Sequence, residues 1–366
     1  MYIWFTNQRI VSLFFIFIKL VYINAISYHF PEQSYDNKQI IEDYYKYGGD
    51  SLNRITSQDI FNQCGIHKRY SSQLDETAKD LGNKAALKLF EEWNIDKNTI
   101  EYLIFVSDAL DYKGPTTACV MQYDLGLPET CATIDVLHGC SGFIYGLSLA
   151  KALISSGQVN NVLVITADTP TKVVHPTDIE LRAIFSDAGA STLVSNQKME
   201  NSLNFEISNF IFGTDGKGEK NLLVERSATK NPADITWLKQ FEHLPGGLRR
   251  GRMKMNSPQI FLFALRKVPI LIAQVLTKNN VKFEEIDYFV LHQANGQMLE
   301  FIRKKLKIPQ EKFIINIENF GNTVSATIPI ALKEMIDNKN KFKKGNKILI
   351  GGFGIGYSWG ATILTI

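Results

Sequence analysis

The stretch ATIDVLHGCSGFIYGLSLAKALISSG (Ala132–Gly157) joins a short apolar strand to an amphipathic helix through a glycine-containing corner. The strand is expected over Thr133–Leu137 and the corner over His138–Gly142. Cys140 then falls at the first turn of the helix, where unpaired backbone N–H groups and the helix dipole favour a thiolate. The stretch predicts either an activated nucleophile on a strand–helix turn or a small buried residue that fills the corner.

Length and composition indicate an ordinary globular protein with one large or two average domains. The chain has 366 residues, of which 45% are hydrophobic and 21% are charged. A net charge of +3 favours neither a nucleic acid nor an anionic membrane as partner. The four cysteines (Cys64, Cys119, Cys131, Cys140) follow no metal-binding or disulfide pattern. They favour a reducing compartment, so we expect a cytoplasmic protein.

The N-terminus carries a nine-residue apolar run, Ile10–Ile18, directly after Arg9. This run is too short to span a bilayer and is similar to the core of a signal peptide. Cleavage near Ala25 would, however, cut into a strand that we expect to begin at Tyr22, and a reactive thiol is poorly suited to export. We therefore expect residues 1–19 to be an extension or a misplaced start, with a signal peptide as the alternative.

The order of segments in the first half of the chain recurs in the second half. NIDKNTIEYLIFVSDA (Asn94–Ala109) corresponds to NNVKFEEIDYFVLHQA (Asn279–Ala294). Leu125–Pro128 likewise corresponds to Leu306–Pro309, and the cysteine helix to FGNTVSATIPIALKEM (Phe320–Met335). Two later strands match in the same way: NVLVITAD (Asn161–Asp168) with NKILIGGFG (Asn346–Gly354), and AGASTLVS (Ala188–Ser195) with WGATILTI (Trp359–Ile366). Two copies of a strand–helix unit predict an α/β fold with mostly parallel central strands.

The repeat also predicts a site. Asn322 corresponds to Cys140, and His292 follows the buried strand that ends at Val290-Leu291. Residues at such strand ends gather at one edge of a parallel sheet, so we expect Cys140, His292 and Asn322 to meet. A cysteine beside two neutral hydrogen-bond donors suits acyl transfer through a thioester. Taken singly, His292 could be a core histidine and Asn322 a helix N-cap. A papain-like protease uses the same three residue types but lacks the duplication.

The chain resembles β-ketoacyl-acyl carrier protein synthase III, a family of thiolase-fold condensing enzymes, over roughly Tyr22–Ile366. The resemblance rests on HGCSGF around Cys140, LHQAN around His292, FGNTVSATIPIAL around Asn322 and GGFGIGYSWG from Gly351. It implies a five-layer αβαβα fold made of two duplicated halves, residues 20–198 and 199–366. It also implies an intimate homodimer that uses acyl-coenzyme A or acyl carrier protein thioesters as substrates and needs neither cofactor nor metal.

The resemblance assigns a role to each site residue. Cys140 would take an acyl group from a thioester donor. His292 and Asn322 would bind the malonyl thioester carbonyl, which assists loss of CO2 and stabilises the enolate. The backbone N–H groups of Cys140 and Ile355 would form the oxyanion hole for the acyl-cysteine. Ile355 stands where the family has glycine, so its side chain is expected to reshape the pocket.

Basic residues on the helix after His292 are expected to receive an acidic partner. Lys304 and Lys305 match family positions implicated in docking of acyl carrier protein, and the alternative is a solvated surface. The family also holds the adenine of coenzyme A between a tryptophan and an arginine. Those positions match Asp59 and Ile179 here, and a further entrance arginine matches Gln63. These changes remove stacking and guanidinium contacts to a nucleotide.

Two further observations bear on the substrate and the reaction. The resemblance implies that in short-chain members the partner subunit inserts a phenylalanine as the pocket floor. That position matches Gly114 or its neighbour, so we expect a longer or unusual acyl group, as in secondary-metabolite relatives. GGFGIGYSWG lacks the second cysteine of a thiolase, and no glutamate matches the base of a hydroxymethylglutaryl-type synthase. A transacylase that does not decarboxylate, and a non-catalytic partner subunit, remain as alternatives.

Overall fold

The computed structural model describes residues 19–366 except Asn53, Leu203, 245–250 and 338–341. The apolar run Ile10–Ile18 lies outside the described residues, so the interpretation of residues 1–19 stays a prediction. A ten-stranded sheet runs in the order β12-β13-β14-β8-β1-β7-β6-β4-β5, with β9 paired to β14. Its strands are β1 (Tyr22–His29), β4 (Tyr102–Ser107), β5 (Ala132–Leu137), β6 (Asn161–Asp168), β7 (Ala188–Ser195), β8 (Phe205–Ile207), β9 (Ile211–Thr214), β12 (Tyr288–Leu291), β13 (Lys347–Gly354) and β14 (Ser358–Thr365).

The two halves of the chain share their strand pairings, as the repeat predicts. In the first half β4 pairs parallel with β6, and in the second β12 pairs parallel with β13. Tyr102 is opposite Val162, and its repeat mate Tyr288 is opposite Ile348. The next pairings, β6 with β7 and β13 with β14, are both antiparallel. The short strand β8 pairs with both β1 and β14, and so links the two portions of the sheet.

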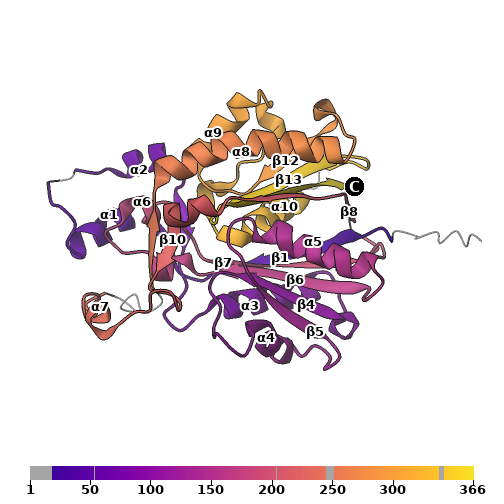
Figure 1. Cartoon of the computed structure of the whole chain (residues 1–366), viewed down its shortest axis with the longest axis horizontal. Helices are drawn as coiled ribbons and strands as arrows, with labels where there is room; N and C mark the ends of the chain where they lie inside the picture. The colour runs from indigo at the N-terminus through magenta and orange to yellow at the C-terminus, as the bar shows by residue number, and fades with distance from the viewer. Residues whose placement is uncertain (1–18, 53, 203, 245–250, 338–341) are drawn as a thin grey trace, which may run out of the picture.

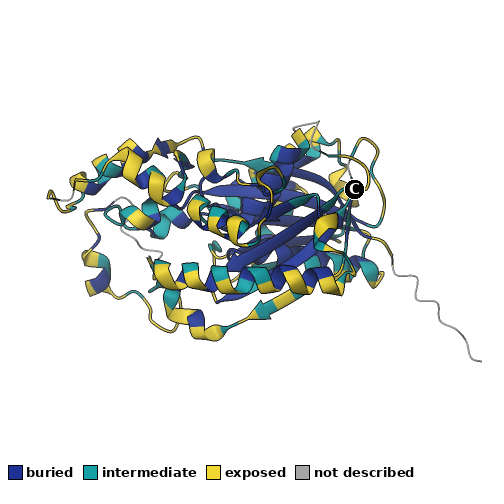
Figure 2. Ribbon diagram, turned by 90° about the horizontal axis from the view of Figure 1, so that it is seen from above, coloured by how far each residue is buried: buried dark blue, intermediate teal, exposed yellow. Residues whose placement is uncertain are grey.

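Helices cover both portions of the sheet and also fill the space between them (Figure 1). The central layer contains α5 (Gly142–Ser155) and α10 (Thr327–Asp337), whose side chains share one apolar cluster with strands of both halves. α3 (Ala78–Glu92) and α4 (Thr117–Leu125) cover the outer face of the first half. α8 (Ser257–Lys278) and α9 (Gly296–Lys305) cover the second. Figure 2 shows buried strands enclosed by helices whose outer faces are exposed, in agreement with the layered α/β fold that the resemblance implies.

The remaining elements lie at the end of the molecule where the site forms. They are β2 (Ser34–Asp36), α1 (Asn37–Lys46), α2 (Ser57–Cys64), β3 (Lys68–Tyr70), α6 (Ile179–Arg182), β10 (Leu222–Glu225), α7 (Ile235–Lys239) and β11 (Arg252–Met255). The halves differ at one functional point. The first half inserts α6 between β6 and β7, whereas only Ile355–Tyr357 separate β13 from β14. That short turn brings Ile355 close to the cysteine corner.

Among the described residues, α8 is the one helix long and apolar enough to cross a membrane by length and composition. Its inner face contributes Phe263, Val268, Leu271 and Val275 to the largest apolar cluster, together with residues of β13 and β14. A core helix of a globular protein passes the same composition test. The packing of α8 on the sheet therefore accounts for its apolar sequence.

Candidate active site

Cys140 lies in the corner between β5 and α5, as the sequence predicts, and it is buried. The end of β13 approaches it so closely that a side chain there would collide. A Cβ added at Gly354 would lie 2.7 Å from the Cys140 Sγ. Ser141 follows as the N-cap of α5, and its hydroxyl lies 2.7 Å from that of Ser358 in β14. This contact fixes the turn containing Ile355 against the corner.

The ionisation of Cys140 differs from the sequence-based prediction of a thiolate. Burial raises the pKa of the thiol to about 12, and the negative charges of Asp108 and Asp168 act in the same direction. Backbone N–H groups of Ile355 and Cys140 face the sulfur and oppose this rise in pKa, but to a smaller extent. The prediction was wrong because it counted only the helix terminus and neglected burial and two nearby carboxyl groups.

His292 follows β12 and is held by the loop that leads into α10. Its Nδ1 lies 2.7 Å from the Thr327 hydroxyl, and the carbonyl of Val324 accepts a hydrogen bond from the ring. Burial lowers the pKa of His292 to about 3, so the imidazole is neutral. The ring is thus anchored by Thr327 at Nδ1 and by the Val324 carbonyl.

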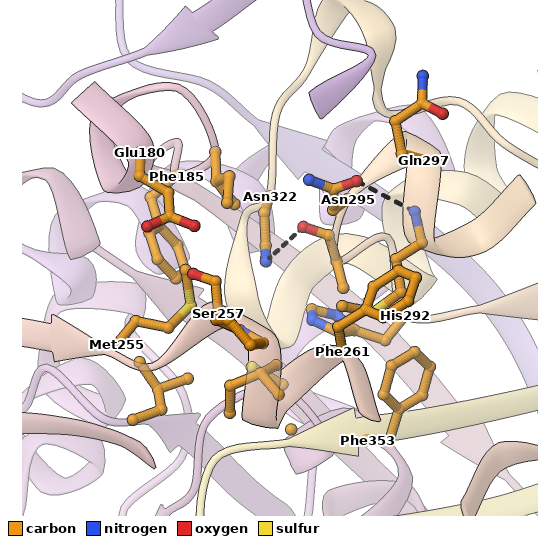
Figure 3. Close-up of a pocket in the computed structure, with 18 of the residues that line it drawn as sticks. Glu180, Phe185, Met255, Ser257, Phe261, His292, Asn295, Gln297, Asn322 and Phe353 are labelled. Atoms are coloured by element: carbon orange, nitrogen blue, oxygen red, sulfur yellow. Dashed lines mark hydrogen bonds between the residues drawn. The ribbon is translucent and has the colours of Figure 1, made fainter. Parts of the chain in front are cut away.

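Asn322 is fixed through both its side chain and its backbone. Its Nδ2 donates to the Ala294 carbonyl at 3.2 Å (Figure 3), and its Oδ1 accepts the backbone N–H of Val324 at 2.9 Å. Its own N–H donates to the Ile184 carbonyl at 2.9 Å. Val324 therefore contacts Asn322 through its N–H and His292 through its carbonyl. It holds a left-handed φ of 54°, which is strained for a β-branched residue and is typical of functional sites.

Cys140, His292 and Asn322 line one pocket, with a volume of about 360 Å³ (Figure 3). Its other walls are mainly apolar. They comprise Ile184, Phe185, Leu222, Met255, Pro258, Ile260, Phe261, Ala294, Met298, Phe353 and Gly354, with the polar residues Gln63, Glu180, Ser257, Asn295 and Gln297. None of these described lining residues is a lysine or an arginine. The pocket thus brings the three predicted residues together at a surface suited to an apolar chain.

Comparisons with known proteins place this site in a family. The model of the 3-oxoacyl-[acyl-carrier-protein (ACP)] synthase III C-terminal domain matches residues 276–366, and the synthase III model matches residues 134–216. β-Ketoacyl-[acyl-carrier-protein] synthase III of Clostridium perfringens is 35% identical over 314 residues, which are 84% of this chain and 90% of that protein. The enzyme of the same name from Clostridioides difficile is 30% identical over 342 residues, 93% of this chain and 97% of that protein. The chain belongs to the β-ketoacyl-[acyl-carrier-protein] synthase III family.

Solved structures of the synthase III family confirm the predicted thiolase-like fold. A 3-oxoacyl-(acyl-carrier-protein) synthase III structure gives a TM-score of 0.85 at 36% sequence identity. The match covers 95% of this chain and 100% of that chain. The residue roles predicted above are not tested by this likeness and return below as proposals.

The positions that depart from the synthase III pattern lie at the pocket or near it. Gln63, at the end of α2, and Glu180, in α6, line the pocket. Asp59 is exposed in α2, where its carboxylate completes a capping box with Thr56. Glu180 was not identified from the sequence. It adds a carboxylate to a pocket whose described walls contain no lysine or arginine. Its position directly after Ile179 was the available signal.

No glutamate matches a base beside the cysteine, but the structure places two aspartates near the corner. Asp108 follows β4, and a Cβ added at Gly139 would lie 3.3 Å from its Oδ2. Asp168 ends β6 and is buried, where it accepts hydrogen bonds from the Asp108 N–H at 2.9 Å and from Ser325. These aspartates were not identified from the sequence, because only a glutamate was considered at this place. In the described residues, no group of three or more His, Cys, Asp or Glu side chains is arranged to hold a metal ion.

Proposed function

We propose that this chain is a β-ketoacyl-acyl carrier protein synthase III that loads an acyl group on Cys140 and condenses it with a malonyl-type thioester of acyl carrier protein. The observation that carries the proposal is one apolar pocket in which a cysteine lies with a neutral histidine and an anchored asparagine. Neither donor carries a charge that would have to be compensated. Both can therefore stabilise a negative oxygen that develops during the reaction.

The reaction would proceed in two half-reactions. The Cys140 sulfur attacks the carbonyl carbon of the donor thioester, an S–C bond forms, and the donor thiol leaves with a proton. Backbone N–H groups of Cys140 and Ile355, which already face the sulfur, would hold the oxyanion. His292 and Asn322 would then bind the malonyl thioester carbonyl while the C–C bond to the carboxylate breaks and CO2 leaves. The resulting enolate attacks the acyl-cysteine and releases the sulfur.

The test separates this condensing enzyme from a transacylase that keeps the same three residues. Purified protein is mixed with acetyl-, butyryl- and octanoyl-coenzyme A and with malonyl-acyl carrier protein, and CO2 and products are measured. We expect CO2 in equal amount to a product that is longer by two carbons. Transfer of the acyl group without CO2 would contradict the condensation and support the transacylase. Activity only after mixing with a related chain would support the partner-subunit alternative.

We also propose that the enzyme is a soluble cytoplasmic homodimer that needs no cofactor besides its thioester substrates. β5 is the last strand of the sheet and pairs only with β4 (Figure 1). Ile134 and Leu137 of this strand are 39% and 70% exposed in the single chain. An apolar sheet edge of this kind favours pairing with another copy. Light scattering of the purified protein checks this; a monomer at micromolar concentration would contradict it. We retain residues 20–198 and 199–366 as the two halves, after an extension of residues 1–19.

Charge reversal at Lys304 and Lys305 is expected to weaken the use of acyl carrier protein. Both residues are exposed in the last turn of α9, whose first turn reaches the pocket through Gln297 and Met298. Since carrier proteins are acidic, Lys304→Glu with Lys305→Glu should raise KM for malonyl-acyl carrier protein about tenfold with little change in kcat.

Two controls accompany this docking experiment. Loading from an acyl-coenzyme A should be unchanged, because that step needs no carrier protein. Lys38 lies on α1, and its side chain is 79% exposed. Lys38→Glu makes the same charge reversal there and should leave KM for malonyl-acyl carrier protein unchanged. Equal KM values for the double variant and the wild type would contradict docking at α9.

The pocket walls further support an acyl donor other than simple acetyl-coenzyme A. Gln63 and Glu180 offer no positive charge to nucleotide phosphates, and the carboxylate of Glu180 repels them. Gly114, proposed to meet the partner subunit at the pocket floor, leaves space: a Cβ there would contact nothing within 4 Å in the single chain. We propose a longer or unusual acyl group, carried by coenzyme A or by a carrier protein.

Gly114→Phe is expected to shorten the preferred acyl chain. The ring would fill the proposed floor of the channel, so the loading rate with octanoyl-coenzyme A should fall at least about tenfold relative to acetyl-coenzyme A. Gly114→Ala is the matched control, because a methyl group leaves the channel nearly as deep. Strict preference of the wild type for acetyl-coenzyme A would contradict the long-chain proposal.

A further inference from the structure

Three parallel strands end around the cysteine corner, and two of them end in carboxyl groups. β4 lies between β5 and β6 in the sheet, so Asp108 after β4 has Cys140 on one side and Asp168 on the other. Asp108 packs on the Gly139 backbone, directly before Cys140, and its charge acts on the Cys140 thiol. An edge of Asp108 is exposed in the single chain, so solvent can reach it.

The two carboxyl groups are not equivalent. Asp168 is fully buried, and burial together with the neighbouring Asp108 charge raises its pKa well above the ordinary value. Asp168 also accepts hydrogen bonds from the Ser107 hydroxyl at 3.2 Å and from the Ser325 N–H at 3.1 Å, which fix its position. Desolvation raises the pKa of both carboxyl groups, but that of Asp168 rises well above its ordinary value, so Asp108 is the more readily ionised of the two. Asp108 is thereby left as the carboxylate that can accept another proton.

The Cys140 thiol needs such an acceptor before it can attack a thioester. With a pKa of about 12, it is ionised in only about one chain in 10⁵ at pH 7. His292 is a poor base, because burial lowers its pKa to about 3 and its ring already contacts Thr327 and the Val324 carbonyl. Three further titratable groups near the corner are His138, Asp108 and Asp168, whereas Asp135 of β5 accepts the N–H groups of Thr117 and Ala118. Burial lowers the pKa of His138, whose ring stacks on Tyr145.

We propose that Asp108 is the proton acceptor for the Cys140 thiol during acyl loading. This rests on the proposed function, in which Cys140 receives the acyl group. The thiol proton passes to the Asp108 carboxylate through one water molecule as the sulfur bonds to the thioester carbonyl carbon. The C–S bond of the donor then breaks, and the leaving thiolate takes the proton back from Asp108. The carboxyl ends in its starting state, so no further reactant is needed.

Asp108→Asn separates this role from a purely electrostatic one, because the two roles predict opposite signs. Removal of the negative charge lowers the pKa of the thiol, so alkylation of Cys140 by iodoacetamide at pH 7 should become faster. The donor is whichever of acetyl-, butyryl- and octanoyl-coenzyme A loads the wild type fastest. With this donor, removal of the base should nevertheless lower the single-turnover rate of Cys140 acylation by about 100-fold. Loading that is unchanged, or faster in step with alkylation, overturns the proposal.

The controls keep the result interpretable. Both rates are measured in a Cys119→Ala background, because Cys119 is an exposed thiol that would also be alkylated. Asp75→Asn makes the same chemical change at an exposed carboxyl outside the pocket walls and should alter neither rate. If the wild type acquires no acyl mass from any donor, the proposed function fails. If the wild type loads normally and Asp108→Asn loads equally well, only the role of Asp108 fails.

A measurement on the Cys119→Ala chain with Asp108 unchanged tests the proposal even if Asp108→Asn does not fold. The loading rate should rise as Asp108 ionises and then level off once that carboxyl is fully ionised. Alkylation by iodoacetamide should instead continue to rise towards high pH, because it follows the thiolate alone. Parallel rises of about tenfold per pH unit in both rates up to about pH 9 would overturn the proposal.

Discussion

The Cys140→Ala variant is expected to acquire no acyl mass from any acyl thioester, whereas the wild type gains one acyl group per chain. Without the sulfur no covalent intermediate forms, so loading and the condensation that depends on it should both fall below detection. Intact-mass spectrometry after mixing with acetyl-, butyryl- and octanoyl-coenzyme A measures this directly. Alanine is close to cysteine in size and the site is buried, so the fold should change little.

Cys119 provides an internal test of whether acylation is catalysed by the enzyme or is a non-enzymatic reaction of an exposed thiol. It is exposed, and hydrogen bonds from Thr116 and Thr133 lower its pKa, whereas burial raises the pKa of Cys140 to about 12. Uncatalysed acylation by a reactive thioester would therefore modify Cys119 first. The matched control Cys119→Ala should keep the full acyl mass of the wild type. Acylation lost in Cys119→Ala and kept in Cys140→Ala would show that the adduct is chemical and that Cys140 is not the nucleophile.

Much of the site could be predicted because it was built by duplication. The repeat places His292 after β12 and Asn322 opposite Cys140, and parallel pairing of β12 with β13 brings those strand ends to one edge. All three residues then line the same pocket. These relations depend on backbone order and register, which a hydrophobic pattern encodes along the chain.

The missed features depend on distances between side chains. In the repeat, Asp108 of the first half corresponds to Ala294 of the second half, which lies two residues after His292. The position of Asp108 near the site could therefore have been predicted from the sequence. Its effect on Cys140 could not, because it depends on the packing of Asp108 against Gly139 and on the buried Asp168 beside it. The pKa of Cys140 is a balance between burial, two carboxyl charges and the helix terminus. Sequence alone shows only the last of these.

His292→Ala is expected to separate the two half-reactions. The acyl-cysteine should still form, because the sulfur and the backbone N–H groups of Cys140 and Ile355 remain. Decarboxylation of malonyl-acyl carrier protein should fall about 10²- to 10³-fold, or about 2.7–4 kcal/mol of lost transition-state stabilisation. Asn322→Ala should have a similar effect and should also release the Val324 N–H that Asn322 Oδ1 accepts. Acyl mass and CO2 release, measured on the same sample, report the two steps separately.

The pH dependence distinguishes a neutral donor from an acid catalyst. Since the pKa of His292 is lowered to about 3, the ring is neutral from about pH 5 to about pH 8. A group with a lowered pKa loses its neutral form only as the pH falls towards that value, so wild-type decarboxylation should show no inflection near the ordinary histidine pKa. His243→Ala, a change at an exposed histidine, should leave both steps intact. An inflection near pH 6.5 that disappears in His292→Ala, or equal loss of acyl loading and CO2 release, would contradict the role of His292 as a neutral hydrogen-bond donor to the enolate.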